Sequence, residues 1–158
     1  MKIKLDLQQA TADKALPSRQ QFKSWILAAL SVGATTPAPT AELCLRIVDE
    51  QEMAELNHSY RGKTGPTNVL SFPSSLPKEI EADYLGDLIV CAPVMRAEAT
   101  AQKKPILDHF AHLIVHGTLH LLGYDHIYED DAKKMEALEV HILVKLGIPN
   151  PYHEELIE

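Results

Sequence analysis

Hydrophobic and polar residues follow two kinds of pattern along this chain, and together they predict four strands and five helices. Charged and apolar residues alternate over residues 2–7 (KIKLDL), which is typical of an edge strand with one buried face. Apolar runs rich in strand-forming residues predict further strands over residues 41–49, 67–72 and 84–92. All four predicted strands therefore lie before residue 93.

Apolar residues three and four positions apart predict the helices. In the first of them one face carries an apolar stripe of Phe22, Trp25, Ile26, Ala29 and Leu30. Ser18 and Asp49 are predicted N-caps, and Pro93 and Pro105 suit the first turn of two further helices. The predicted helices cover residues 19–30, 50–60, 94–104, 106–122 and 129–146, and Gly62, Gly123 and Gly147 end three of them. Four strands among five helices, without internal repeats, predict one α/β (α+β) domain over residues 1–158 with a mixed sheet.

Composition supports a globular protein that folds without a metal or a disulfide. The chain has 158 residues, of which 46% are hydrophobic and 23% charged, so it can bury a core of its own. No apolar run reaches the roughly 18 residues of a membrane span, and the first ten residues lack the features of a signal peptide. Cys44 and Cys91 lie in strand-like runs without CxxC spacing, so we expect reduced, buried thiols and a cytoplasmic protein.

The net charge of −7 argues against a general nucleic-acid binder, for which a basic surface is expected. Basic residues gather only in short groups, such as Arg61 with Lys63 and the pair Lys103 and Lys104. Such groups usually mark a solvated face. Any affinity for nucleic acid is therefore expected to be local.

Histidines are concentrated in one segment, HLIVHGTLHLLGYDH (residues 112–126). Five of the 8 histidines lie between His109 and His126. On a helix, His112, His116 and His120 share one face, but the first and third are roughly 12 Å apart along the axis. Ligands of one metal ion lie about 3 to 4 Å from each other, so only neighbouring members of this stripe can share a metal.

Gly123 decides between the two neighbouring pairs, because a glycine turn after the helix brings His126 back toward His116 and His120. The resulting pattern, H-x3-H-x5-H, provides three imidazoles and leaves a fourth zinc position open, as in catalytic sites. A single helix-face histidine more often has a structural role, but three at this spacing favour zinc.

The other histidines are not expected to bind the metal. His109 and His112 are expected beside the site or in the core, and His58, His141 and His153 at the surface. Asp125 either supports a ligand or stabilises a turn.

The same histidine spacing occurs in metzincin peptidases, where a glutamate general base follows the first ligand. Here that position is Gly117. A zinc metallopeptidase therefore remains an alternative function that lacks its expected base.

Two segments, LNHSYRGKTGPTNVLSFP (residues 56–73) and HLIVHGTLHLLGYDH, closely resemble the YbeY family of bacterial endoribonucleases. The intervening LGDLIVCAP is similar to the next strand of that family, so the resemblance covers most of residues 56–126. It implies a zinc-dependent, single-strand-selective endoribonuclease that matures the 3′ end of small-subunit ribosomal RNA and acts in ribosome quality control. A non-catalytic ribosome assembly factor is a further alternative.

The resemblance assigns His116, His120 and His126 as ligands of one zinc ion per chain, at the end of a central helix, and Arg61 as a functional arginine. Arg61 and His116 are the predicted catalytic residues. A guanidinium can grip a phosphodiester with two hydrogen bonds, although an arginine that neutralises helix-end carbonyls is an equally good interpretation from the residues alone. Two nucleophiles stay open, a metal-activated water, which we favour, and the 2′-hydroxyl of the RNA.

The resemblance also names partners. It implies single-stranded ribosomal RNA as substrate, on the small ribosomal subunit, together with an Era-type GTPase and a small-subunit ribosomal protein. No membrane partner is expected. An enzyme that meets its RNA on a ribosomal particle needs only a local basic lining, which makes the acidic net charge compatible with this role.

Overall fold

Strands and helices follow one another along the chain largely as the hydrophobic pattern predicts. The computed structural model describes residues 2–34, 40–75, 83–125 and 127–152. Its elements are β1 (Lys2–Ala10), α1 (Arg19–Gly33), β2 (Thr40–Val48), α2 (Glu50–Arg61), β3 (Val69–Pro73), β4 (Tyr84–Cys91), α3 (Ala92–Ala101), α4 (Ile106–Leu121) and α5 (Glu129–Lys145).

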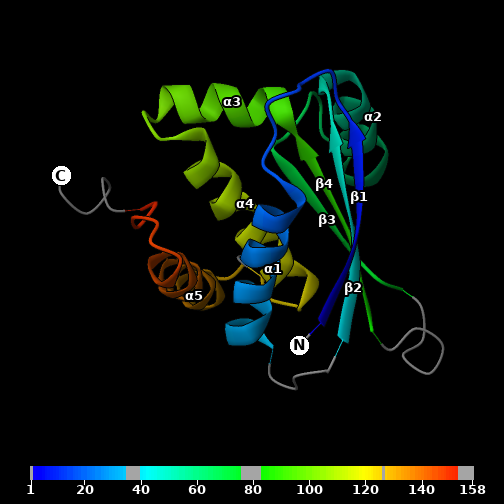
Figure 1. Ribbon diagram of the computed structural model, residues 1–158. Helices are drawn as coiled ribbons and strands as arrows, with labels where there is room; N and C mark the ends of the chain where they lie inside the picture. The colour runs from blue at the N-terminus through cyan, green and yellow to red at the C-terminus, as the bar shows by residue number, and fades with distance from the viewer. Residues whose placement is uncertain (1, 35–39, 76–82, 126, 153–158) are drawn as a thin grey trace.

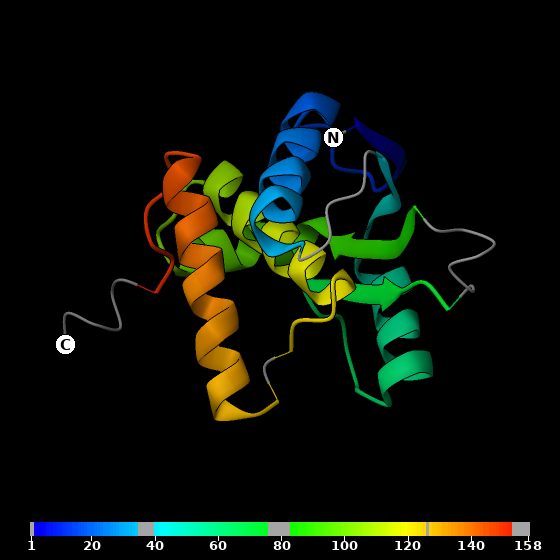
Figure 2. The same cartoon turned by 90° about the horizontal axis from the view of Figure 1, so that it is seen from below.

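The four strands form one sheet in the order β1-β2-β4-β3. β1 pairs with β2 and β2 with β4 in parallel, whereas β3 runs antiparallel to β4 and closes one edge. Helices α1, α4 and α5 lie on one side of this sheet and α2 lies on the other (Figures 1 and 2). The prediction of a single α/β domain with a mixed four-stranded sheet is confirmed.

Helix α1 begins where its sequence predicts. The Ser18 hydroxyl accepts from the Gln21 amide at 3.1 Å, and the Gln21 side chain accepts from the Ser18 amide at 2.8 Å, which completes a capping box. The buried face of this helix consists of Phe22, Trp25, Ile26, Ala29, Leu30 and Gly33. The first five of these form the predicted apolar stripe, which packs against α4 and the sheet.

Asp49 is the N-cap residue of α2, as predicted, but its side chain makes no capping hydrogen bond to this helix. Its carboxylate instead accepts from the Ala12 amide at 3.0 Å and from the Thr11 hydroxyl. The competing partners lie in the loop after β1, which no local pattern reveals. Asp49 therefore ties this loop to the start of α2.

Helix α3 begins and ends earlier than predicted, and it ends at Ala101 because residues 102 and 103 form a turn in which Lys103 takes a left-handed conformation (φ 56°). The next helix, α4, is central to the fold: ten of its residues are buried, and it contacts α1, α3, α5, β3 and β4. Cys91 is buried and Cys44 partly buried, and both are free thiols. Within the described ranges, no helix is long and apolar enough to cross a membrane.

Candidate active site

His116 and His120 point toward the same place from the last turns of α4. Residues four apart lie on one face of a helix, and the two imidazole rings here have centroids 4.6 Å apart. Their Nε2 atoms face each other at 3.1 Å. This separation falls within the range of about 3 to 4 Å expected for two nitrogen ligands of one zinc ion.

The other nitrogen of each ring is held by a hydrogen-bond acceptor. His120 donates from Nδ1 to the Tyr124 carbonyl at 2.9 Å, and His116 donates from Nδ1 to the Glu139 carboxylate. With the proton on Nδ1, each Nε2 presents a lone pair, and two lone pairs this close repel unless a cation lies between them. This arrangement of oriented imidazoles is the one that zinc sites use, so the two residues fit a metal.

Glu139 of α5 is fully buried, with 0% of the residue exposed. It also accepts from the Tyr152 hydroxyl at 2.5 Å, and His112 Nε2 lies 3.6 Å from its second oxygen. Burial acts to raise the pKa of Glu139, but the imidazoles of His112 and His116 and the Tyr152 hydroxyl outweigh burial and lower the pKa to about 2. The ionised carboxylate therefore makes His116 a stronger electron donor at its Nε2.

The sequence interpretation missed Glu139. The signal was present, because Glu139 lies four residues after Met135 and three before Ile142, and both are buried on the same face of α5. A carboxylate on the apolar face of a helix requires a buried partner. That partner is the predicted ligand His116 on the neighbouring helix.

A hollow of about 720 Å³ opens above the two histidines and is called here the histidine hollow. Its walls come from the end of α2, the edge strand β3 and the turn after α4. Its lining includes Arg61, Asn68, Ser71, His116, His120 and Asp125. The structure therefore brings Arg61, His116 and His120 together, as the sequence predicts, whereas His126 lies outside the described residues. The roles of all four remain predictions.

Gly117, which follows His116, faces the sheet and not the histidine hollow. A Cβ added at Gly117 would lie 2.9 Å from Leu88 Cδ2 and 3.3 Å from the Ser71 hydroxyl oxygen. Ser71 also donates to the Gly117 carbonyl at 3.2 Å. A glutamate at this position would force the Leu88 side chain to move, which weighs against the peptidase alternative.

The remaining candidates lie in varied surroundings. His109 is buried, with Nε2 2.8 Å from Glu98, whose second hydrogen-bonding partner is Asn68. Asp125 lines the histidine hollow and accepts from the Ile127 amide at 3.1 Å, so it stabilises a turn there.

The other histidines that the structure describes lie apart from the histidine hollow. His112 packs edge-on against Tyr152, and burial lowers the pKa of His112. His58 and His141 are exposed as predicted, and His153 lies outside the described residues.

Comparison with known proteins agrees with this architecture. The family model described as Endoribonuclease YbeY matches residues 6–147. A curated Endoribonuclease YbeY of Colwellia psychrerythraea is 48% identical over 151 residues, covering 96% of this chain and 97% of that protein. A protein of Thermotoga maritima with a known solution structure shares the fold, with a TM-score of 0.55 and 20% identity over 89% of this chain and 91% of its own. The chain therefore belongs to the YbeY family of endoribonucleases.

Proposed function

We propose that this protein is a zinc-dependent endoribonuclease that cleaves single-stranded RNA during maturation of the 3′ end of small-subunit ribosomal RNA. The observation that carries the proposal is the 3.1 Å approach of His116 Nε2 and His120 Nε2 in a hollow that Arg61 also lines. Family membership supplies the reaction class, because the matching family model and relative are endoribonucleases.

His116 and His120 would hold the zinc ion, with His126 proposed as the third ligand. A bound zinc ion supplies a Lewis acid for a phosphate oxygen and lowers the pKa of its water toward about 7. Glu139 and the Tyr124 carbonyl keep the protons of His116 and His120 on Nδ1. Each ring therefore directs Nε2 into the histidine hollow.

Arg61 is proposed to hold the scissile phosphodiester. It is exposed at the end of α2 and lines the same hollow as the two histidines. Its guanidinium can donate two parallel hydrogen bonds to phosphate oxygens and stabilise negative charge as it develops. The attacking group is either water or the 2′-hydroxyl of the substrate, and we favour water.

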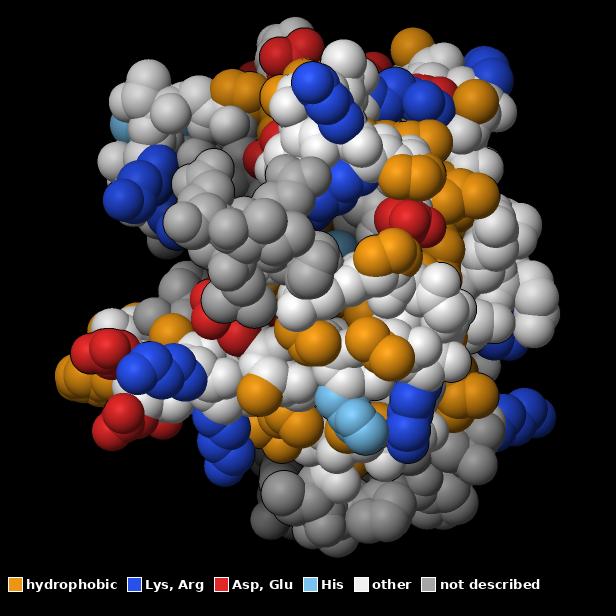
Figure 3. Space-filling model, turned by 90° about the vertical axis from the view of Figure 1, so that its left-hand side faces the viewer, with side chains coloured by type: hydrophobic (Ala, Val, Ile, Leu, Met, Phe, Trp, Pro, Cys, Tyr) orange, Lys and Arg blue, Asp and Glu red, His pale blue; other side chains and the backbone are white. Residues whose placement is uncertain are grey.

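The partners proposed for the chain are ribosomal RNA in the small subunit, an Era-type GTPase and a small-subunit ribosomal protein. The protein would act in the cytoplasm and take part in ribosome quality control. Basic and acidic side chains are interspersed on the face shown in Figure 3, and the net charge of the chain is −7. Binding to naked RNA is therefore expected to be weak and to decrease with salt. Other parts of the ribosomal particle would supply the remaining affinity.

The test is to incubate the purified protein, with and without a chelator, with single-stranded RNA, duplex RNA and casein. We expect cleavage of the single strand, slower cleavage of the duplex, intact casein and complete loss of activity with chelator. His116→Ala and His120→Ala should be inactive, whereas His141→Ala, at an exposed site on α5, should match the wild type. Cleavage of casein alone would establish the peptidase, and no cleavage of any substrate would favour an assembly factor.

A further inference from the structure

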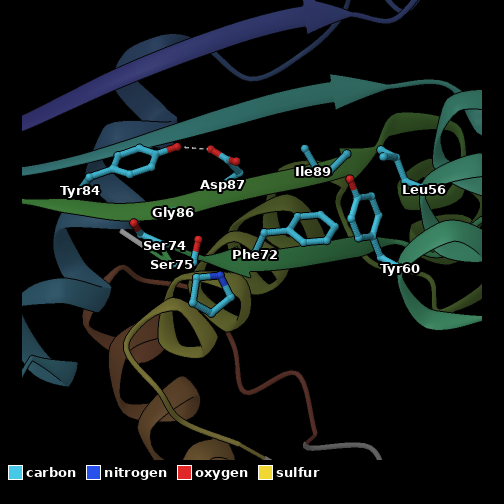
Figure 4. Close-up of a pocket in the computed structure, with 10 residues that line it drawn as sticks. Leu56, Tyr60, Phe72, Ser74, Ser75, Tyr84, Gly86, Asp87 and Ile89 are labelled. Carbon is cyan, nitrogen blue, oxygen red and sulfur yellow. Dashed lines mark hydrogen bonds between the residues drawn. The ribbon is translucent and has the colours of Figure 1, made fainter. Parts of the chain in front are cut away.

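A second hollow of about 400 Å³ lies on the opposite face of the sheet, beside the C-terminal half of α2. Figure 4 shows its side chains in front of β3 and β4, with Leu56 and Tyr60 contributed by α2. We call it the aromatic hollow, after Tyr60, Phe72 and Tyr84 in its lining. The metal site does not use it.

The aromatic hollow adjoins the histidine hollow at the edge strand β3. Tyr60, Phe72 and Pro73 line both of them. Arg61, the residue after Tyr60, lines the histidine hollow. A chain molecule held by Arg61 can therefore place its next unit over Tyr60.

Tyr60 has the properties of a stacking platform. It is 67% exposed although it is large and aromatic, and its ring packs against Phe72 with centroids 5.1 Å apart at an interplanar angle of 67°. Phe72 fixes the ring from one side and leaves most of its surface to solvent. Such a fixed aromatic face binds another flat ring at a small entropic cost.

The charge of the aromatic hollow favours a base over a phosphate. Among the described residues that line it, Asp87 is the only Asp, Glu, Lys, Arg or His. Asp87 lies opposite Phe72 in the β3–β4 pair and accepts from the Tyr84 hydroxyl (Figure 4). A carboxylate repels phosphate but accepts hydrogen bonds from the N–H groups of nucleobases. One nucleotide can therefore place its phosphate beside Arg61 in the histidine hollow and its base beside Asp87 in the aromatic hollow.

We infer that the aromatic hollow is a nucleobase subsite, in which a base flanking the scissile phosphate stacks on Tyr60. The inference rests on the proposed ribonuclease function and extends it to substrate selection. A base can enter only after leaving its own stack, which single-stranded RNA allows and a duplex resists. Tyr60 thereby becomes a residue that determines selectivity for single strands.

Binding is tested without any need for turnover. Single-stranded RNAs carrying 2-aminopurine at successive positions are mixed with the protein, because stacking on an aromatic ring quenches the fluorescence of this base. We expect strong quenching at one position with the wild type and with Tyr60→Phe, and its loss with Tyr60→Ala. Tyr128→Ala is the matched control, because Tyr128 is 72% exposed and lines neither hollow. Absence of quenching at every position, as expected if the hollow takes a protein partner, would overturn the inference.

Kinetics separate this inference from the proposed function. Tyr60→Ala should raise KM for single-stranded RNA about tenfold, equivalent to about 1.4 kcal/mol, with kcat nearly unchanged. An abasic nucleotide at the quenched position should raise KM similarly for the wild type and have no further effect on Tyr60→Ala. If the wild type cleaves RNA but Tyr60→Ala and the abasic nucleotide raise KM additively, the nucleobase subsite is wrong and the ribonuclease function is retained. If the wild type cleaves nothing, the ribonuclease is wrong and the quenching result alone decides on the base site.

Discussion

At the scale of single residues, the site depends on which histidines share a metal. We expect about one zinc per chain, lost in His116→Ala, His120→Ala and His126→Ala, because each would remove one of three proposed ligands. His112→Ala should largely retain zinc, since His112 contacts Glu139 and Tyr152 and lies outside the lining of the histidine hollow. Elemental analysis of the purified variants measures this directly. An equal loss of zinc from His112→Ala would change the choice of ligands.

Glu139 should control how tightly the zinc is held. Glu139→Gln keeps the shape of the side chain but removes the charge that orients His116, so we expect zinc affinity to fall about 10- to 100-fold. Tyr152→Phe removes one hydrogen bond to the same carboxylate and should produce a smaller decrease. Competition with a chelator of known affinity gives both values. Unchanged affinity in Glu139→Gln would make the carboxylate a purely structural partner.

Arg61 should matter far more for activity than for folding. Because its side chain is exposed, Arg61→Ala should change the free energy of unfolding by no more than about 0.5 kcal/mol. Its kcat/KM should fall at least about tenfold, if the guanidinium stabilises charge on the phosphate. Lys63→Ala, an exposed cation two residues away, is the control and should retain activity. Parallel losses of stability and turnover in Arg61→Ala would contradict a catalytic role.

At the scale of helices and strands, the hydrophobic pattern correctly predicted the features that depend only on residues close together in the sequence. The α1 stripe and the Ser18 cap depend on residues within one or two turns, and both agree with the prediction. Asp49 and Glu139 show the opposite case, because their partners lie 37 and 23 residues away. Spacing placed His116 and His120 as candidates and the family resemblance added Arg61, but neither revealed the acceptors that orient the two imidazoles.

The contact between the loop after β1 and helix α3 should make stability depend on pH. Asp13 accepts from Arg96 at 3.0 Å, and the Arg96 guanidinium lowers the pKa of Asp13 below its ordinary value of 3.8, despite partial burial. A lowered folded-state pKa means that the stabilisation is fully present above the unfolded value and is lost as pH falls through the folded value.

Arg96→Gln should therefore unfold at lower urea than the wild type near neutral pH, and the difference should shrink below about pH 4. Urea unfolding at a series of pH values measures the change. Lys133→Gln is the control, since Lys133 pairs with Glu129 in a strongly exposed contact and should have little effect at any pH. A difference that is independent of pH would show that packing, and not charge, accounts for the role of Arg96.

At the scale of the whole molecule, the sequence predicted a mixed sheet but not which strand reverses. The order β1-β2-β4-β3 places β3 at the edge beside α4, where its residues line both hollows. Neither the order nor the direction of β3 follows from periodicity, because strand pairing depends on contacts distant in sequence. For the same reason, the sequence could not predict that the two hollows adjoin at this edge.

The residues that support the proposed metal site also bear on the order in which the site forms during synthesis. His116 and His120 lie on α4, but the carboxylate that orients His116 is at residue 139, and the hydroxyl that binds this carboxylate is at residue 152. Synthesis proceeds from the N-terminus, so a nascent chain presents its histidines well before their support exists. We therefore expect full affinity for the proposed zinc ion only after residues 139 and 152 have both left the ribosome. A nascent chain that has exposed its histidines alone would not yet be able to cleave RNA.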